Sequence, residues 1–569
     1  MPSPLETYER AEDTILLGNA TAETKISAVL ALARGGATEL ALKRFKGFQL
    51  DQLADNENAL ALLGRLLKDR ASTLPKPEQR IALEESADAY HKAWQITGGH
   101  YSGINAATLY TLAGKTDIGQ DIAKRTLKTA SPMKVKETPE ARYYRKASCA
   151  EAHLLLGKTD KARTVLAEAR KLDPTNWVAH ATTLRQFERI LTYQNKDTDW
   201  LNGFRPPQTC FYTGRIQGIV ANSKPALAIT ERINLFLDNT PLTYAYGALA
   251  AGVDILFAEA ALARGTQLNI LLPCQKDVFE TYSVAPFGKA WVSRYRECLS
   301  QASIVTEATN DDTLMGETAI SLAAQISMGQ AIDQADALAT RAVQALIQPS
   351  DRGLSAQLKQ TWLSSGRGFE SVTLEASNIS LAGTKMPTPE LPGSRRNLAA
   401  MLFADLTGFG QLNDEDVRNV LTHILGPLSE ALKSTGVAMT HVDSWGDGIF
   451  AVFDDVASAT KAARALQNKM QNISFVDSNL PATLSLRIGC HYGPVTYADD
   501  PITGRPGVFG SQVSYAAKIE PVAVPGAILA SEAFASALAL SPYNEASSHY
   551  IGRQSLKGIA RPVRLFSIN

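Results

Sequence analysis

Two aspartates in the last third of the chain are placed where a twisted sheet would present metal-binding carboxylates. Asp405 ends the apolar run of LFADLTGFG (402–410), just before a Thr-Gly turn that leads toward a helix. Asp447 lies within HVDSWGDGIFAVF (441–453), where its two flanking glycines predict a tight hairpin between strands. Mg²⁺ prefers one or two carboxylates and fills its other positions with water and substrate phosphate. The pair therefore predicts a site for a nucleoside triphosphate and its metal.

An isolated Asp near Gly often only caps a helix or fills a turn, but the surrounding segment weighs against that alternative. Residues 397–569 resemble the class III nucleotide cyclase (adenylate/guanylate cyclase) catalytic domain in both motif content and motif order. The resemblance is carried by LFADLTGF, SWGDGIFAVF, LRIGCHYGPV (486–495) and GVFGSQVSYAAKIEPVAVPGAILAS (507–531), with a predicted helix over 414–434. It implies a ferredoxin-like domain that converts a nucleoside triphosphate to a 3′,5′-cyclic nucleotide and pyrophosphate.

The resemblance also assigns the metal and phosphate ligands. Asp405 and Asp447 would hold two Mg²⁺ or Mn²⁺ ions, assisted by the backbone carbonyl of Leu406. The triphosphate would accept hydrogen bonds from backbone N–H groups, those of Thr407, Gly408 and Phe409.

Two catalytic positions depart from the family pattern. The family has an Asn and, four residues later, an Arg that position the ribose and stabilise the transition state, and this chain has Ser514 and Lys518 there. Lys518 keeps the positive charge without the planar fork of Arg, and Ser514 is too short for the same ribose contact. These departures leave open a second interpretation, a catalytically weak or inert nucleotide-sensing or dimerising module.

The positions that resemble the base pocket carry Asp443 and Gly507. ATP-specific members have a Lys at the first position, and a carboxylate cannot donate a hydrogen bond to adenine N1. It can accept from guanine, or from the amino group of cytosine. We therefore expect GTP or a pyrimidine triphosphate rather than ATP, unless Asp443 is only a solvated strand residue.

Nearby charged residues are given lesser roles. His441 and His491 fall on predicted strands and are expected to be hydrogen-bonded structural residues. Arg487 would pair with a carboxylate or reach phosphate, and the sequence does not decide between the two. Because family members build each site from two protomers and this chain contains one such domain, a homodimer is implied.

Composition limits the other functions. The chain has 569 residues, 57 basic and 57 acidic side chains, and a net charge of zero, which gives no electrostatic case for nucleic acid. Its five cysteines lack metal-ligand spacing, and a polar start gives no leader peptide, so a cytoplasmic protein is expected. The most apolar long window, 242–263, contains acidic residues and does not predict a membrane span.

The first part of the chain, 1–200, is predicted to be an α-solenoid. AEAHLLLGKTDKARTVLAEARKLDP (150–174) resembles a tetratricopeptide (TPR) unit, and residues 87–127 have similar spacing and the same Gly-Lys-Thr-Asp turn. Such solenoids usually bind a protein or a neighbouring domain, although a helical scaffold without an external partner is also possible.

Residues 205–372 alternate predicted strands and helices, which favours a Rossmann-like parallel sheet. Residues 246–273 resemble sensor domains of the LOG/SLOG type, and Gly247 and Gly252 precede a helix start where a phosphate could bind N–H groups. Such glycines also serve only for close packing. The Pro-, Gly- and Ser-rich segment 373–396 is predicted to be a linker to the cyclase-like domain.

Overall fold

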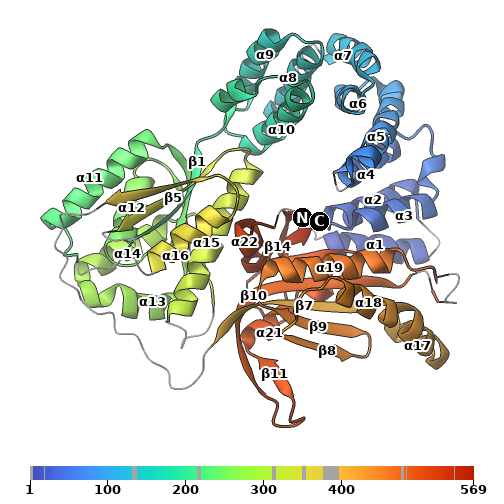
Figure 1. Cartoon of the computed structure of the whole chain (residues 1–569). Coiled ribbons are helices and arrows are strands. Elements are labelled where there is room, and N and C mark those ends of the chain that lie inside the picture. The colour runs from blue at the N-terminus through green and yellow to red at the C-terminus, as the bar shows by residue number, and fades with distance from the viewer. Residues whose placement is uncertain are drawn as a thin grey trace. The chain divides into compact units, whose positions relative to one another are not determined.

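The computed structural model describes residues 4–569 except 18–19, 73, 131–136, 215–218, 310–315, 349–353, 376–395, 476–479, 482, 544 and 560. The chain forms two compact units (Figure 1). Unit 1 contains Met1–Arg205, Ala523–Ala527 and Asn569, and unit 2 contains Pro206–Val522 and Ile528–Ile568. In the described part of the chain, no helix combines the length and apolarity needed to cross a membrane.

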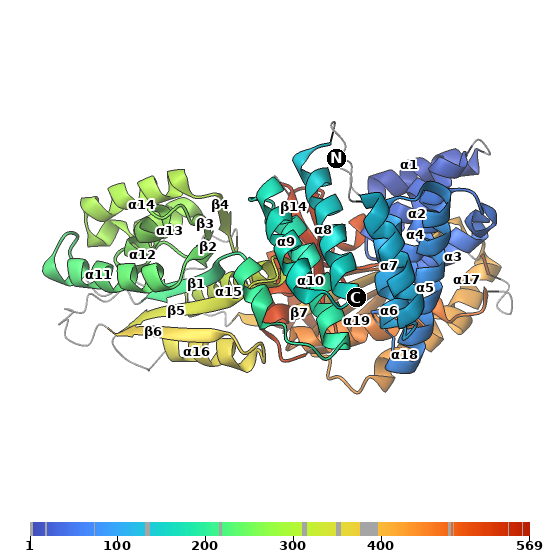
Figure 2. The same ribbon diagram turned by 90° about the horizontal axis from the view of Figure 1, so that it is seen from above.

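Unit 1 is helical and confirms the predicted solenoid character. Antiparallel neighbours pack in sequence order, and Figure 2 shows α8, α9 and α10 side by side. Its helices are α1 (Pro4–Leu16), α2 (Ala22–Arg34), α3 (Thr38–Gly47), α4 (Glu57–Ala71), α5 (Lys76–Thr97), α6 (His100–Leu112), α7 (Thr116–Ala130), α8 (Pro139–Leu155), α9 (Thr159–Leu172) and α10 (Trp177–Tyr193).

The two Gly-Lys-Thr-Asp turns have the same geometry. Gly114 and Gly157 both have positive φ, 88° and 75°. The N–H of the following lysine donates in each case to a carbonyl five residues earlier, Lys115 to Tyr110 and Lys158 to His153. This Schellman arrangement ends one helix and starts the next, so the repeated sequence encodes a repeated turn.

Unit 2 begins with a parallel sheet of strand order β4-β3-β2-β1-β5-β6, as the alternating sequence pattern predicts. The order reverses between β1 and β5, which fits a doubly wound, Rossmann-like arrangement. Its elements are β1 (Gln208–Gly214), α11 (Lys224–Asn239), β2 (Leu242–Gly247), α12 (Val253–Leu262), β3 (Gln267–Leu272), α13 (Lys276–Ser283), α14 (Lys289–Gln301), β4 (Ile304–Glu307), α15 (Glu317–Ala337), β5 (Ala342–Gln348), α16 (Leu354–Ser364) and β6 (Glu370–Glu375).

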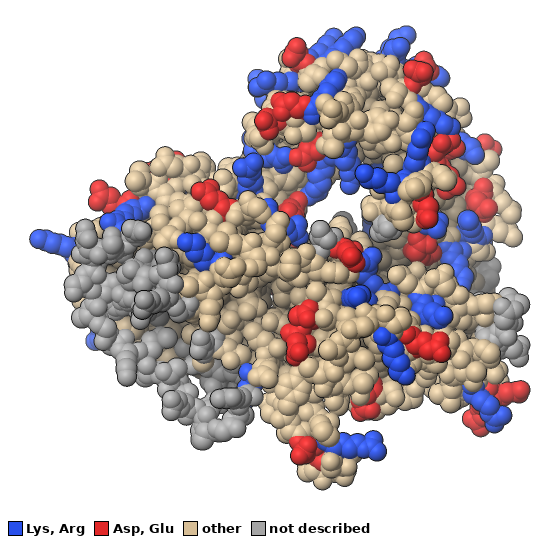
Figure 3. All heavy atoms as spheres, in the orientation of Figure 1, with Lys and Arg blue, Asp and Glu red and all other residues tan. Residues whose placement is uncertain are grey.

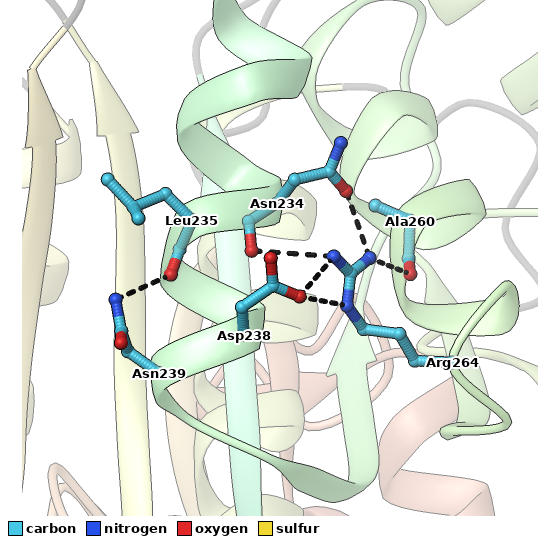
Figure 4. A network of polar contacts seen from close by, with 6 residues as sticks. All are labelled: Asn234, Leu235, Asp238, Asn239, Ala260 and Arg264. Carbon is cyan, nitrogen blue, oxygen red and sulfur yellow. Dashed lines mark hydrogen bonds and ion pairs between the residues drawn. The ribbon is translucent and has the colours of Figure 1, made fainter.

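A polar network ties α12 to the end of α11 (Figure 4). The Arg264 guanidinium, just after α12, donates to Asp238 Oδ1 at 2.6 Å and to Asn234 Oδ1 at 2.9 Å. It also donates to the carbonyl of Ala260 at 3.0 Å. One side chain therefore fixes the C-terminal ends of two neighbouring helices.

The predicted linker was placed slightly too early. Strand β6 extends to Glu375 and pairs with β5, so residues 373–375 belong to the sheet. Most of the remaining predicted linker, 376–395, lies outside the described residues.

The second sheet of unit 2 has the order β13-β14-β12-β10-β7-β9-β8, with β11 paired to β10. Most neighbours are antiparallel, whereas β10 and β12 run parallel. The elements are β7 (Asn397–Thr407), α17 (Asp414–Val420), a π-helical turn (Leu421–Leu425), α18 (Gly426–Ser434), β8 (His441–Trp445), β9 (Gly448–Phe453), α19 (Val456–Gln471), β10 (Ser485–Asp499), β11 (Pro506–Phe509), α21 (Ser511–Ala516), β12 (Ile528–Ser531), α22 (Glu532–Leu540), β13 (Ser548–Gln554) and β14 (Val563–Ile568).

The two sheets of unit 2 are joined by close packing of α15 on α22. Gly329 of α15 lies so near α22 that an added Cβ would be 2.2 Å from the Ser536 carbonyl oxygen. Hydrogen bonds flank this contact, from Tyr492 to Gln325 at 3.3 Å and from Ser548 to Asp333 at 3.5 Å. The α15 helix is thus part of the core of both sheets.

Gly329→Ala is expected to lower the Tm of unit 2 by several degrees, because a methyl group at this crossing forces the helices apart at about 1–3 kcal/mol. Thermal unfolding followed by calorimetry measures the change. Gly316→Ala is the matched control, since Gly316 begins the same helix and faces open space. Equal Tm values for the two variants would contradict the tight crossing.

Candidate functional site

Asp405 lies on the more open face of the second sheet. Side chains alternate along β7, and Leu402 and Ala404 enter the core formed with α18, α19 and α22. Met401 and Phe403 point to the opposite face, which packs against α21 and β11. Asp405 shares this second face and is partly exposed, so its carboxylate is available to a ligand.

Asp447 lies at the tip of a two-residue hairpin, as the sequence predicted. Trp445 of β8 pairs with Gly448 of β9, leaving Gly446 and Asp447 as the loop. Gly446 has a φ of 64°, a conformation that glycine adopts without steric cost at the first position of such a turn. The hairpin holds the Asp447 side chain at the sheet end.

The β7–β9 register brings the two aspartates together. Ala404 pairs with Ile449, which places Asp405 beside the hairpin that carries Asp447. Burial, followed by the charge of Asp405, raises the pKa of Asp447 above its ordinary value. A cation shared by the two carboxylates would relieve the repulsion that Asp447 experiences from Asp405.

The donor set fits Mg²⁺ or Mn²⁺. It offers two carboxylates, and Leu406, whose carbonyl the sequence predicts as a further ligand, is the next residue after Asp405 on β7. Within the described residues, no group of three or more His, Cys, Asp or Glu side chains is arranged for a metal. An ion that keeps water and substrate phosphate among its ligands needs no such group, so the oxygen-only pair suits a hard divalent ion.

The turn after β7 takes the predicted form. Gly408 has a φ of 87°, and a short 3₁₀ turn follows over Phe409–Gln411. Thr407 donates its hydroxyl to the Ser485 carbonyl at 3.0 Å, and the Phe409 side chain packs against the core. Side chains therefore anchor the turn.

Arg487 pairs with a carboxylate, one of the two roles that the sequence left open. From β10, its Nη2 lies 3.1 Å from Asp405 Oδ2, and its Nε lies 2.8 Å from Glu520 Oε1. Burial raises the pKa of Glu520 to about 7, although Arg487 opposes the shift. Sequence analysis missed Glu520. The only signal for it is an acidic residue next to a proline, two positions after Lys518.

Ser514 and Lys518 lie at and just beyond α21. Ser514 is exposed, and the Lys518 Nζ lies near Gly558. In the described part of the chain, neither side chain is bonded to Asp405 or Asp447. No hydrogen bond or ion pair thus links the two halves of the predicted site within the described residues of one chain.

The two predicted base-recognition residues lie on different strands. Asp443 is exposed on β8, and its Oδ1 accepts a hydrogen bond from the Ser444 N–H at 2.8 Å. Gly507 is on β11 opposite Ala498, where an added Cβ would be 2.8 Å from the Phe509 ring. Asp443 is free to accept from a ligand, whereas Gly507 leaves room for an aromatic side chain.

His491 is structural, as expected. Its ring nitrogens lie 2.7 Å from Ser531 Oγ and 2.8 Å from Gln512 Oε1, and burial lowers its pKa to about 4. The neutral imidazole therefore links β10 to α21. His441 stacks obliquely on Phe450 on the exposed face.

The glycine turn of the central sheet is already occupied by a carboxylate. Gly247 ends β2, and Gly252, with a φ of 96°, precedes α12. The buried Asp254 side chain accepts from the N–H groups of Gly214 at 3.1 Å and Ala250 at 3.2 Å. Burial raises the pKa of Asp254 to about 7. These two N–H groups are therefore not free for a phosphate.

Two family models match the chain. Residues 392–569 match "Adenylate and Guanylate cyclase catalytic domain", and residues 4–110 match "Tetratricopeptide Repeats-Sensor". The C-terminal part of the chain is therefore a class III cyclase domain, and the N-terminal part carries TPR-type repeats.

Curated relatives resemble the cyclase part of the chain. A putative adenylate cyclase of Rhizobium meliloti is 28% identical over 30% of this chain and 28% of its own length. A pH-sensitive adenylate cyclase of Mycobacterium tuberculosis is 30% identical over 33% of this chain and 44% of its own length. The chain thus spans less than half the length of these relatives. Among solved structures, the adenylyl cyclase CyaB of P. aeruginosa is 20% identical, with a TM-score of 0.28, over 31% of this chain and 96% of that one.

Proposed function

We propose that this protein is a nucleotide cyclase that converts a nucleoside triphosphate to a 3′,5′-cyclic nucleotide and pyrophosphate by a two-metal mechanism. The observation that carries the proposal is the meeting of Asp405 and Asp447, one from a strand and one from a hairpin tip, on the open face of the sheet. The matched cyclase model covers both residues.

Each residue has a proposed task. Asp405, Asp447 and the Leu406 carbonyl hold the ions, and the backbone N–H groups at 407–409 orient the triphosphate. When bound, the two divalent ions acidify the attacking 3′ hydroxyl and neutralise phosphate charge. Lys518 places a positive charge beside the transferring phosphoryl group, and Ser514 reaches the ribose through water.

The active form is proposed to be a homodimer with each site shared between protomers. Within the described part of one chain, Ser514 and Lys518 form no hydrogen bond or ion pair with Asp405 or Asp447, and a second copy is proposed to supply them. Exposed aromatic residues are available for such contact, since the side chain of Trp445 is 58% exposed and that of Phe509 is 40% exposed. Rotation of one protomer on the other would then open or close the sites.

Regulation is proposed to enter through the packing of α15 on α22. Strand β12 leads directly into α22 and pairs with β10, which carries Arg487. A ligand that moved the central sheet would therefore act on strands that hold the site. The TPR-type unit would supply a protein-binding surface.

The protein is proposed to act in the cytoplasm. Its five cysteines are buried and free, which fits a reducing compartment. Basic and acidic side chains are both spread over the face drawn in Figure 3, and we propose no nucleic-acid partner.

Two observations favour different bases. The exposed Asp443 can accept hydrogen bonds from guanine or cytosine, whereas the curated relatives are named adenylate cyclases. Incubation of the full-length protein with ATP, GTP, CTP or UTP and Mn²⁺ or Mg²⁺, followed by mass spectrometry, tests both points. A cyclic product supports the enzyme and identifies the base.

Absence of product from all four nucleotides, in a protein that still binds one of them, would favour the second candidate. That candidate is a weak or inert cyclase-like module that senses nucleotide or dimerises. The observations in its favour are Ser514 and Lys518, which replace the family's Asn and Arg.

Asp443→Lys is expected to raise the ratio of ATP to GTP turnover by about tenfold or more, because a donor replaces an acceptor in the base pocket and such a contact discriminates by about 1–3 kcal/mol. Competition assays with both nucleotides measure the ratio. Asp454→Lys makes the same charge change at another exposed position and serves as the control. A ratio that moves equally in both variants would remove Asp443 from base recognition.

A further inference from the structure

The Arg487 guanidinium connects a proposed metal ligand to a buried acid. It lies 3.1 Å from Asp405 and 2.8 Å from Glu520, through different nitrogens. The Asp405 side chain is 33% exposed, whereas that of Glu520 is 10% exposed. The guanidinium thus has one partner that a ligand can reach and one that lies inside the protein.

Glu520 is held firmly in place. An added Cβ at Gly489, the residue two positions after Arg487 on β10, would be 2.4 Å from the Glu520 backbone nitrogen. Pro521 follows and restricts the backbone further. Since β10 and Glu520 are in direct contact, Glu520 remains a partner for Arg487 when the guanidinium leaves Asp405.

Arg487 and a divalent ion would compete for the Asp405 carboxylate. In the described part of the chain, Asp405 forms its ion pair with Arg487 alone, and Asp447 has no ion pair. A divalent ion on Asp405 would compete for the oxygen that Arg487 contacts and would repel the guanidinium at short range. The ion pair with Glu520 gives the displaced guanidinium a partner.

We propose that Arg487 is a positioning residue that holds Asp405 in place until a divalent ion binds, and that Glu520 makes this exchange possible by retaining the displaced guanidinium. Its relevance to catalysis rests on the proposed function, but the exchange itself concerns only metal binding. Glu520 is two residues from Lys518. Through Arg487 and Glu520, metal binding at Asp405 would therefore affect the segment that carries Lys518.

The test is Mn²⁺ binding to the full-length protein, followed by the electron paramagnetic resonance signal of free Mn²⁺. Glu520→Gln is expected to weaken Mn²⁺ binding by about tenfold, because Arg487 then keeps only Asp405 as a charged partner. Arg487→Gln removes the competitor, and the double variant is expected to bind as tightly as Arg487→Gln alone.

A matched control tests a similar ion pair away from the site. Glu259 pairs with Arg294, whose side chain is 23% exposed, as is that of Arg487. Glu259→Gln should leave Mn²⁺ binding unchanged. Glu520→Asp keeps the carboxylate charge and should bind Mn²⁺ nearly as tightly as the unaltered protein. Such binding would also show that a substitution at this position leaves the site folded.

The inference would be overturned by unchanged Mn²⁺ binding in Glu520→Gln. It would also be overturned if Glu520→Gln weakened Mn²⁺ binding equally in the unaltered protein and in the Arg487→Gln variant. Absence of Mn²⁺ binding by the unaltered protein would overturn it as well. If Glu520→Gln weakens Mn²⁺ binding only when Arg487 is present, but the protein makes no cyclic product, the exchange is supported and the proposed function fails.

Discussion

Asp405→Ala or Asp447→Ala is expected to reduce formation of cyclic nucleotide by about a thousandfold or more, since metal ions contribute several kcal/mol to such a transition state and each 1.4 kcal/mol is about tenfold. Both residues should have this effect, because they lie together on one face of the sheet. Among the described residues, no third His, Cys, Asp or Glu side chain completes a metal-binding group there. Initial rates of product formation, read by mass spectrometry, measure the loss.

Folding should not suffer in Asp447→Ala. Burial and the charge of Asp405 raise the pKa of Asp447, so its ionised form is less stable in the folded protein than in the unfolded chain. Removal of the Asp447 carboxylate is therefore expected to leave Tm unchanged or to raise it. Asp454→Ala, at an exposed position after β9, should keep full activity. Undiminished product from Asp405→Ala or Asp447→Ala would rule out the two-metal assignment.

Lys518→Met should give the second large effect, a loss of about 10²–10³ in kcat with little change in nucleotide binding, because one donor to developing charge contributes about this much. The methylene stem of lysine is kept while the ammonium is removed. Lys518→Arg restores the planar fork found in the family and should retain or exceed the original rate. A Met variant as active as the unaltered protein would favour the inert-module interpretation.

Mixing Asp405→Ala protein with Lys518→Met protein tests whether each site is shared. A mixed dimer places both defects in one site and leaves the other intact. About half of the dimers are mixed after exchange, so roughly a quarter of the original activity is expected to return. Mixing without recovery, between subunits shown to exchange, would place Lys518 and Asp405 in the same protomer's site.

Features with a local cause were predictable. The repeated Gly-Lys-Thr-Asp sequence gave two turns with the same hydrogen bonds at Gly114 and Gly157. The Gly-Asp-Gly segment gave the hairpin that carries Asp447. Local errors were small, as at β6, whose last three residues, 373–375, were assigned to the linker.

Features that depend on distant residues were not predictable. The role of Glu520 follows from its approach to Arg487, which lies 33 positions earlier and pairs with Asp405 across two strands. The glycine turn before α12 looked suited to phosphate until the buried Asp254 was placed on its N–H groups. In both cases an acidic side chain, Glu520 or Asp254, comes from a distant part of the sequence and contacts polar groups of another segment.

The sequence by itself determined the order of domains and the turns, because periodicity and turn chemistry act between neighbouring residues. Its resemblance to a known family singled out the two aspartates that are proposed to bind metal. Only the tertiary structure decided the β7–β9 register that brings Asp405 beside Asp447, the pairing of Arg487 with both Asp405 and Glu520, and the packing of α15 into the cyclase core through Gly329. Strand register and helix crossings join residues far apart in the chain, and burial sets the strength of the charges that meet there.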